Sequence, residues 1–310
     1  MKPIAKSLGV ALVVLSSFVM ALWAGTGAWF TLAPMPSARQ EISTSVFNGE
    51  VFVVAGFDVD GASTDTVEVY NPNTDSWRRA APLPIGTNHN AAAVAAGGLY
   101  AFGGTSNRVF QYDPDADAWL DVAPMHYPHG NTPAVAVIED RIYVAGGNGG
   151  GMRGNEVEVY DPLVDAWTDL TPMNVPRNHT AGGAIAGKFY VVGGRDGPVA
   201  ATALEVYDPQ TNAWDTLSPM PTGRSGIAAG VVNGRLYVFG GELPRLFGEV
   251  EVYDAASSRW EQLPLMPTPR HGIFAAVIDN AIYLPGGAIA QGFGATNVNE
   301  VFVAVQPSTP

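Results

Sequence analysis

The chain has 310 residues, of which 15% are charged and 47% are apolar, and this balance excludes a generally disordered protein. Its 36 glycines and 24 prolines follow no three-residue period, so collagen is excluded and many tight turns are predicted. The formal charge of −13 repels phosphate backbones, so no nucleic-acid partner is expected, and the absence of cysteine rules out disulfides and a lipoprotein anchor.

The N-terminus has the order of a secretory signal. Lys2 and Lys6 precede an apolar run over residues 8–24, and small residues follow at 24–28. We predict a signal peptide over residues 1–28, with Ala24 and Ala28 as candidate cleavage points, and a periplasmic or extracellular protein from a prokaryotic envelope. An uncleaved membrane anchor is the alternative, since the run is nearly long enough to span a bilayer. Removing residues 1–28 leaves 29 acids against 14 bases, a charge of −15.

Residues 29–306 contain a six-fold repeat, followed by a short tail at 307–310. Tryptophans recur at intervals of 42 to 48 residues, and a Gly-Gly or Ala-Gly pair follows each of them. A tyrosine stands seven residues before each tryptophan after the first. The tryptophans are Trp29, Trp77, Trp119, Trp167, Trp214 and Trp260. The spacing from glycine to tyrosine varies, which indicates loops, whereas the other spacings are nearly constant, which indicates strands.

Each repeat predicts four short strands. In the fourth repeat these cover residues 180–186, 189–192, 204–207 and 213–217. Asn48-Gly49 and Asn233-Gly234 are strong hairpin signals. The first strand of each repeat is rich in Ala and Gly, which fit where blades converge on an axis. Four-stranded units of about 47 residues predict an all-β fold, a six-bladed β-propeller.

The two ends of the repeat predict how the ring closes. Residues 29–32 have no preceding strands of their own, and the last repeat ends at residues 301–304 without a fourth strand. The N-terminal strand should therefore complete the sixth blade and remove exposed sheet edges. We expect a monomer.

A family resemblance rests on the run Gly193-Gly194, Tyr207-Asp208-Pro209, Trp214, Pro219-Met220-Pro221 and Arg224. This pattern resembles the kelch motif, and six copies in register cover residues 29 to about 305. The resemblance implies a propeller that binds other molecules without catalysis. Some exported bacterial kelch propellers are sialic-acid mutarotases, which gives an alternative function. Copper radical oxidases with kelch repeats need a Cys–Tyr crosslink, which this chain cannot form.

Ten residues after the tryptophan an arginine recurs in four of the six repeats, with Thr87 and His129 in the other two, and a glutamate recurs in four third strands. We interpret the two as structural pairs between blades rather than as a basic ring at the pore. The residues just after the arginine differ between repeats and should rim the channel on the face with the variable loops. Three of them are histidines, which serve as acid, base or metal ligand. The alternative is a wet polar vestibule without chemistry. The candidate ligand-binding residues are Glu41, Asn88, His89, Asn131, Arg177, Asn178, His179, Arg224, Arg270 and His271.

The predicted function is an exported binding propeller whose loop face takes a protein, peptide or glycan. The alternative is a carbohydrate-active enzyme, a sialic-acid mutarotase or epimerase-like propeller, with acid–base residues at the channel mouth. No motif for a cofactor or metal is found, and no catalytic residue is assigned. A zinc site with His89 and His179 as ligands remains an alternative, whereas zinc sites that need cysteine are impossible. A membrane is expected as a partner only if the N-terminal segment stays uncleaved.

Overall fold

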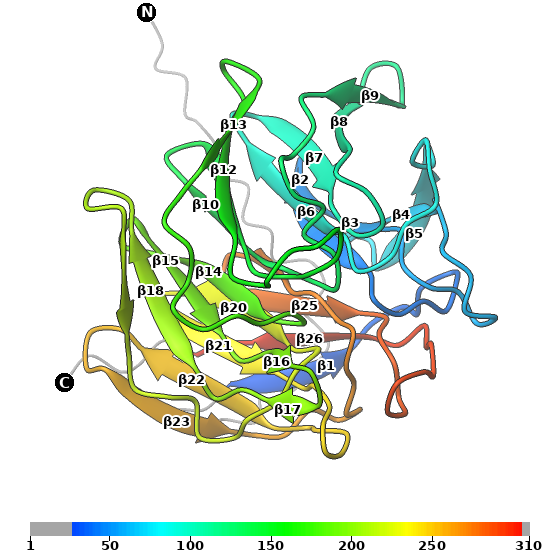
Figure 1. Cartoon of the computed structure of the whole chain (residues 1–310). Coiled ribbons are helices and arrows are strands. Elements are labelled where there is room, and N and C mark those ends of the chain that lie inside the picture. The colour runs from blue at the N-terminus through cyan, green and yellow to red at the C-terminus, as the bar shows by residue number, and fades with distance from the viewer. Residues whose placement is uncertain (1–26, 306–310) are drawn as a thin grey trace, which may run out of the picture.

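The computed structural model describes residues 27–305, which form six four-stranded antiparallel sheets arranged around an axis (Figure 1). The fold is the predicted all-β six-bladed propeller. Nearly all of the predicted signal peptide and the predicted tail lie outside the described residues. Within residues 27–305 no helix is long and apolar enough to cross a bilayer.

The strands follow one another from the axis outward in each blade. Blade 1 contains β2 (Ser43–Phe47), β3 (Glu50–Val54), β4 (Val67–Asn71) and β5 (Ser76–Ala80). Blade 2 contains β6 (Ala91–Ala95), β7 (Gly98–Phe102), β8 (Val109–Asp113) and β9 (Ala118–Val122). Blade 3 contains β10 (Ala134–Ile138), β11 (Arg141–Ala145), β12 (Val157–Asp161) and β13 (Ala166–Asp169).

The second half of the chain repeats this order. Blade 4 contains β14 (Ala181–Ile185), β15 (Lys188–Val192), β18 (Leu204–Asp208) and β19 (Ala213–Thr216). A small hairpin of β16 (Arg195–Asp196) and β17 (Val199–Ala200), which the sequence did not predict, lies in its loop. Blade 5 contains β20 (Ala228–Val232), β21 (Arg235–Phe239), β22 (Val250–Asp254) and β23 (Arg259–Leu263). Blade 6 contains β24 (Ala276–Ile278), β25 (Ala281–Pro285), β26 (Asn299–Val303) and β1 (Ala28–Thr31).

The ring closes as predicted, with the N-terminal strand completing blade 6. Strand β1 pairs antiparallel with β26, so that Trp29 lies opposite Phe302, and Figure 1 shows these two strands side by side. Strand β1 begins at Ala28, one residue before the predicted boundary. Closure leaves no unpaired edge between the first and last blades, which removes a site for aggregation.

The recurring tryptophans and tyrosines join neighbouring blades. In blade 4, Trp214 donates its indole N–H to the carbonyl of Thr171 in the preceding connection, at 2.8 Å. Asn212 accepts both the hydroxyl of Tyr207, at 2.7 Å, and the amide of Thr171, at 3.0 Å. The same tryptophan contact recurs around the ring at Trp29, Trp77, Trp119, Trp167 and Trp260. The repeat therefore encodes a hydrogen-bonded contact between successive blades, made by the tryptophan.

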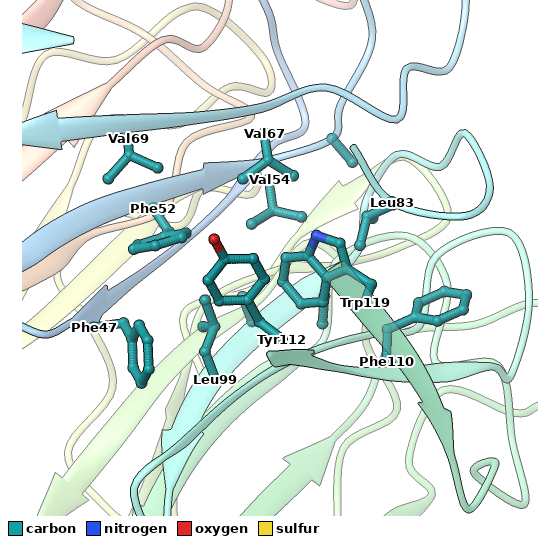
Figure 2. Packing of buried hydrophobic residues seen from close by; sticks show 13 residues of the cluster. Phe47, Phe52, Val54, Val67, Val69, Leu83, Leu99, Phe110, Tyr112 and Trp119 are labelled. Atoms are coloured by element: carbon teal, nitrogen blue, oxygen red, sulfur yellow. The ribbon is translucent and has the colours of Figure 1, made fainter. Parts of the chain in front are cut away.

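Apolar side chains fill the wedge between each pair of blades. Between blades 1 and 2, Tyr112 and Trp119 pack against the side chains of Phe52 and Val54, as Figure 2 shows. Equivalent clusters lie between the other blades. Burial of this apolar surface is the main stabilising contribution in a chain without disulfides.

The recurring arginines are buried in ion pairs. Arg177 contacts Glu205 at 2.7 Å, and both side chains are inaccessible to solvent. Arg270 pairs with Glu300 at 2.8 Å, and Arg224 pairs with Glu251. The predicted pairing of arginine with glutamate is confirmed, but the prediction that it joins neighbouring blades is wrong. Each arginine precedes the first strand of a blade and pairs with the third strand of that same blade, tying the connection between blades to the blade it enters.

These pairs correct part of the predicted ligand site. Arg177, Arg224 and Arg270 are almost fully buried, so they are not available to a ligand. Each also donates to backbone carbonyls within its blade. Burial without such partners would strongly destabilise the fold, and this explains why the arginine recurs.

Candidate ligand site on the propeller axis

A ring of backbone hydrogen bonds surrounds the axis where the innermost strands begin. The amide of Glu41 donates to the carbonyl of Gly272, that of His89 to Glu41, and that of Gly226 to His179, each at 2.9 Å. The amide of Gly272 donates to Gly226 at 2.9 Å. The repeat that begins at Trp119 has one residue more than the others between its tryptophan and its Gly-Gly pair. Two residues therefore share its position in the ring: the amide of Thr132 donates to the carbonyl of His89, and the carbonyl of Asn131 accepts from the amide of His179.

Every position of this ring has a left-handed backbone. The φ angles are 50° at Glu41 and 51° at His89 and His179, whereas the glycines at 226 and 272 adopt the same region without strain. Non-glycine residues adopt positive φ rarely, and clusters of them occur at functional sites. We call the side chains that converge here the axial cluster: Glu41, His89, Thr132, His179 and His271, with Arg195 and Glu242 from the loops above.

Glu41 is the centre of the axial cluster. Its carboxylate lies 3.4 Å from Nε2 of His89 and 3.6 Å from Nδ1 of His271, and Thr132 donates to it at 3.4 Å. The side chain is almost fully buried. A carboxylate there needs compensating partners, and the imidazole of His271 and the hydroxyl of Thr132 lie close enough to provide them.

Hydrogen bonds fix the orientation of each imidazole. Nδ1 of His179 donates to Oδ1 of Asn178 at 2.6 Å, and Nδ1 of His89 contacts Oδ1 of Asn88 in the same way. Nε2 of His271 donates to the carbonyl of Ala290 at 3.0 Å. The predicted Asn–His pairs therefore act together, with the asparagine holding the histidine ring.

Arg195 and Glu242 complete the cluster from the loops. Nη2 of Arg195 donates to Nε2 of His179 at 2.9 Å, and Nη1 of Arg195 contacts Glu242 at 2.8 Å. Neither residue was among the candidate ligand-binding residues that the sequence indicated. Their position directly after the Gly-Gly pairs of blades 4 and 5 is the signal that would have placed them, because those pairs end at the axis.

The cluster shifts the pKa values of its members in different directions. Burial lowers the pKa of His179 to about 3, against the attraction of Glu41. Burial also opposes the charged form of His271, but Glu41 and Glu242 outweigh it and raise the pKa of this imidazole. Burial alone would raise the pKa of Glu41, yet the neighbouring histidines hold it well below its usual range. Groups with displaced pKa values are typical of functional sites.

The polar side chains at the channel mouth are packed together rather than lining a wet vestibule. Glu41, His179 and His271 are buried, and His89, at 14% side-chain exposure, is the most accessible of the four. Asn131 lies exposed beside Asn148. Beyond the cluster, a channel of about 400 Å³ runs between the inner strands, lined mainly by apolar and small residues such as Ala136 and Gly183. The polar side chains thus form a packed layer at one end of an apolar channel.

Metal binding fits this layer poorly. Donor atoms of Glu41, His89 and His179 lie within 4.8 Å of one another. The Nε2 atom of His179 is already taken by Arg195, however, and a guanidinium at 2.9 Å repels a divalent cation. The zinc site left open through His89 and His179 is therefore disfavoured, and acid–base or hydrogen-bonding chemistry suits the layer better.

Comparisons with known proteins agree with this architecture. A family model described as the KLHDC2/KLHL20/DRC7 Kelch-repeats domain matches residues 87–241 and 178–304, and a Kelch motif model matches residues 38–84. Kelch repeat and BTB domain-containing protein 12 of Homo sapiens is 34% identical over 87 residues, covering 24% of this chain and 14% of that protein. Beta-scruin of Limulus polyphemus is 35% identical over 75 residues, covering 24% of this chain and 8% of that protein.

A solved structure, described as the structure of YjhT, superposes with a TM-score of 0.76 at 16% sequence identity. It covers 90% of this chain and 98% of that chain, which establishes the shared fold. The curated relatives match the present chain over only a small part of their own lengths.

Proposed function

The chain belongs to the kelch-repeat family, and from this premise we propose that it is an exported binding propeller whose loop face docks a protein partner. Kelch propellers are generally protein-interaction folds. One observation carries the proposal. Apolar side chains are exposed on the face formed by the long loops, in two adjacent blades.

We call Val59, Ile289 and Phe293 the apolar patch. Val59 lies in the β3–β4 loop, and the other two lie in the β25–β26 loop. All three are well exposed, with Phe293 at 45%. The two loops adjoin, because a Cβ at Gly61 would lie 3.7 Å from the ring of Phe293. Exposed aromatic and aliphatic side chains on a rigid frame are typical anchors of protein interfaces.

The patch is held in place before any partner arrives. The side-chain amide of Gln40 makes two hydrogen bonds with the β25–β26 loop. It donates to the carbonyl of Gly292 at 3.0 Å and accepts from the amide of Gly294 at 2.8 Å. Glu242 accepts the amide of Gly292 at 2.8 Å. A preorganised loop loses little entropy on binding, which favours affinity.

Photo-crosslinking tests this proposal. A photoreactive phenylalanine analogue at position 293 should crosslink one defined partner in the producing cells. The same analogue at Leu163 should not, although Leu163 is 83% exposed in a turn of the opposite face. Equal crosslinking from both positions, or none from position 293, contradicts the proposal.

Export is part of the same proposal, supported by the N-terminal sequence. Of the two candidate cleavage points, Ala24 suits the fold better. Gly27 packs against Phe302, where a Cβ would lie 2.3 Å from the ring, and Ala28 already pairs with Val303. N-terminal sequencing of protein from the extracellular or periplasmic fraction tests this, and an uncleaved chain in the membrane fraction contradicts it.

The axial cluster supports a second candidate, a carbohydrate-active enzyme such as a sialic-acid mutarotase. Here titratable groups with displaced pKa values converge beneath the loop face, as acid–base catalysis requires. Of the three histidines in the cluster, His89 is the most exposed. The test is equilibration of sialic-acid anomers followed by NMR. Acceleration by the wild type that is lost in His89→Gln supports this candidate, and a rate equal to that in buffer excludes it.

A further inference from the structure

Blade 3 departs from the pattern of buried ion pairs found in other blades. It keeps the glutamate, Glu158, but replaces the arginine by His129. Nδ1 of His129 lies 2.6 Å from the carbonyl of Gly146, so this nitrogen carries the proton. Nε2 lies 3.1 Å from Oε1 of Glu158, but it has no aligned hydrogen-bond partner among the described residues. The permanent positive charge of the guanidinium is therefore missing from this blade.

The residue opposite Glu158 increases the negative charge further. Asp169 on β13 is its direct partner in the sheet register. The equivalent glutamates of blades 1, 4, 5 and 6 face no carboxylate, since their partners are Arg79, Thr216, Gln262 and Thr31. Like charges directly opposite each other destabilise a strand pair. Because Glu158 is also fully buried, blade 3 needs a compensating cation.

His126 brings a third donor to the same place. Its Nδ1 lies 2.7 Å from Oδ1 of Asp169 and 3.6 Å from Oε2 of Glu158. Donor atoms of these three residues all lie within 4.8 Å of one another. His126 is 47% exposed and Asp169 is 57% exposed, so an ion can enter from solvent and retain water ligands.

From this geometry we propose that His126, Glu158 and Asp169 bind a divalent transition-metal ion of the zinc class at the outer part of blade 3. One imidazole and two carboxylates suit Zn²⁺, whereas Ca²⁺ and Mg²⁺ prefer oxygen donors throughout. Ligands about 2.0–2.1 Å from a tetrahedral ion are about 3.3 Å apart, a value between the 2.7 and 3.6 Å that join Nδ1 of His126 to the two carboxylates. The ion supplies the charge that the arginine supplies elsewhere.

His129 has a positioning role in this site. It contacts the other oxygen of Glu158, and its Nδ1–H is held by the carbonyl of Gly146. The backbone amides of His126 and Tyr127 also donate to Glu158, at 3.1 and 3.3 Å. The buried carboxylate is thus fixed in orientation, as the surroundings of protein metal ligands usually are. The bound ion would fasten the connection before β10 to β12 and β13.

The test uses protein prepared without a polyhistidine tag, with Zn²⁺ as the probe at pH 7.5. At a hundredfold excess over Kd, Zn²⁺ should raise the unfolding midpoint by about 5 °C. Co²⁺ should give the visible absorption of a bound ion. Asp169→Asn, a change at an exposed position, should weaken binding at least tenfold, and His126→Asn should do the same. His89→Gln in the axial cluster should leave the affinity unchanged.

A further variant distinguishes a bound metal ion from a protonated histidine as the source of the positive charge beside Glu158. His129→Arg introduces the arginine found in blades 1, 4, 5 and 6, so it should raise the midpoint of the metal-free protein and abolish the Zn²⁺ shift. The proposal is overturned if wild type shows neither the shift nor the Co²⁺ absorption, in which case a protonated His126 provides the charge. It is also overturned if the shift persists in His129→Arg or in the double variant of His126 and Asp169.

Discussion

Positions that recur around the ring and positions that differ between blades play different parts in this molecule. The recurring tryptophan and arginine make the same buried contacts from blade to blade, as Trp214 and Arg177 illustrate. The positions of the axial ring share one left-handed backbone but vary in chemistry, from Glu41 through the histidines to Gly226. The repeat therefore specifies the scaffold, and function is to be sought where the repeat is broken.

Removing a recurring charge should have the largest effect on stability, and it tests whether the recurring positions form the scaffold. Arg177→Ala leaves Glu205 buried without a partner and should lower the free energy of unfolding by about 3–5 kcal/mol. Arg141→Ala, in an exposed pair with Asp161, should cost less than about 1 kcal/mol. Denaturant unfolding measures both.

A double variant then separates structure from ligand binding. Arg177→Met with Glu205→Leu should recover most of the lost stability, because an apolar pair needs no countercharge. If the single variant costs less than 1 kcal/mol, the structural interpretation of the recurring pair is wrong.

The axial ring can be tested through its glycines. Gly272→Ala would place a Cβ 2.6 Å from Oε1 of Glu41 at a φ of 60°. Gly49→Ala is the matched control, since it also has positive φ but has open space around it. The left-handed backbone costs each variant about 1–2 kcal/mol. Gly272→Ala should lose about 1–2 kcal/mol more. Equal losses would show that the axial cluster is not tightly packed.

Removing the tryptophan hydrogen bond between blades should have a smaller effect on stability. Trp214→Phe keeps an aromatic ring but loses the hydrogen bond to Thr171. We expect a loss of about 1–2 kcal/mol in the free energy of unfolding, from the unpaired carbonyl and the smaller ring. An unchanged denaturation midpoint would show that this hydrogen bond does not stabilise the contact between blades.

The axial cluster should also give a pH dependence of stability. Because the pKa of His179 is about 3 in the folded protein and about 6.5 when unfolded, the unfolded state binds more protons between these values. Stability should therefore fall as pH falls below 6.5, by up to about 1.4 kcal/mol per pH unit. His271, with a raised pKa, acts oppositely, and its contribution is lost as pH rises through the folded value.

His179→Gln isolates this contribution. The slope of stability against pH between 6.5 and 4.5 should become flatter, since Glu41 begins to titrate in the unfolded state only near the lower limit. Thermal melts across this range measure the slope. An identical slope in wild type and variant would show that His179 is not buried in its neutral form.

The sequence predicted the scaffold more completely than the site. The spacing of Trp214 and Gly194 was enough to predict the blades, because strand lengths are fixed by packing. The convergence of Glu41, His89, His179 and His271 also followed, because inner strands begin around one axis. Their burial did not follow, because it depends on loops from other blades that carry Arg195 and Glu242. The site in blade 3 was missed because Asp169 joins it only through the sheet register.

Binding of the crosslinked partner to matched variants tests the central claim most directly. Phe293→Asp should weaken binding at least about thirtyfold, the loss of one interface hot spot, whereas Leu163→Asp and His179→Gln should bind like wild type. That result would place recognition on the loop face, at residues outside the repeat. Unchanged binding by Phe293→Asp together with a loss in His179→Gln would contradict it and place the function in the axial cluster.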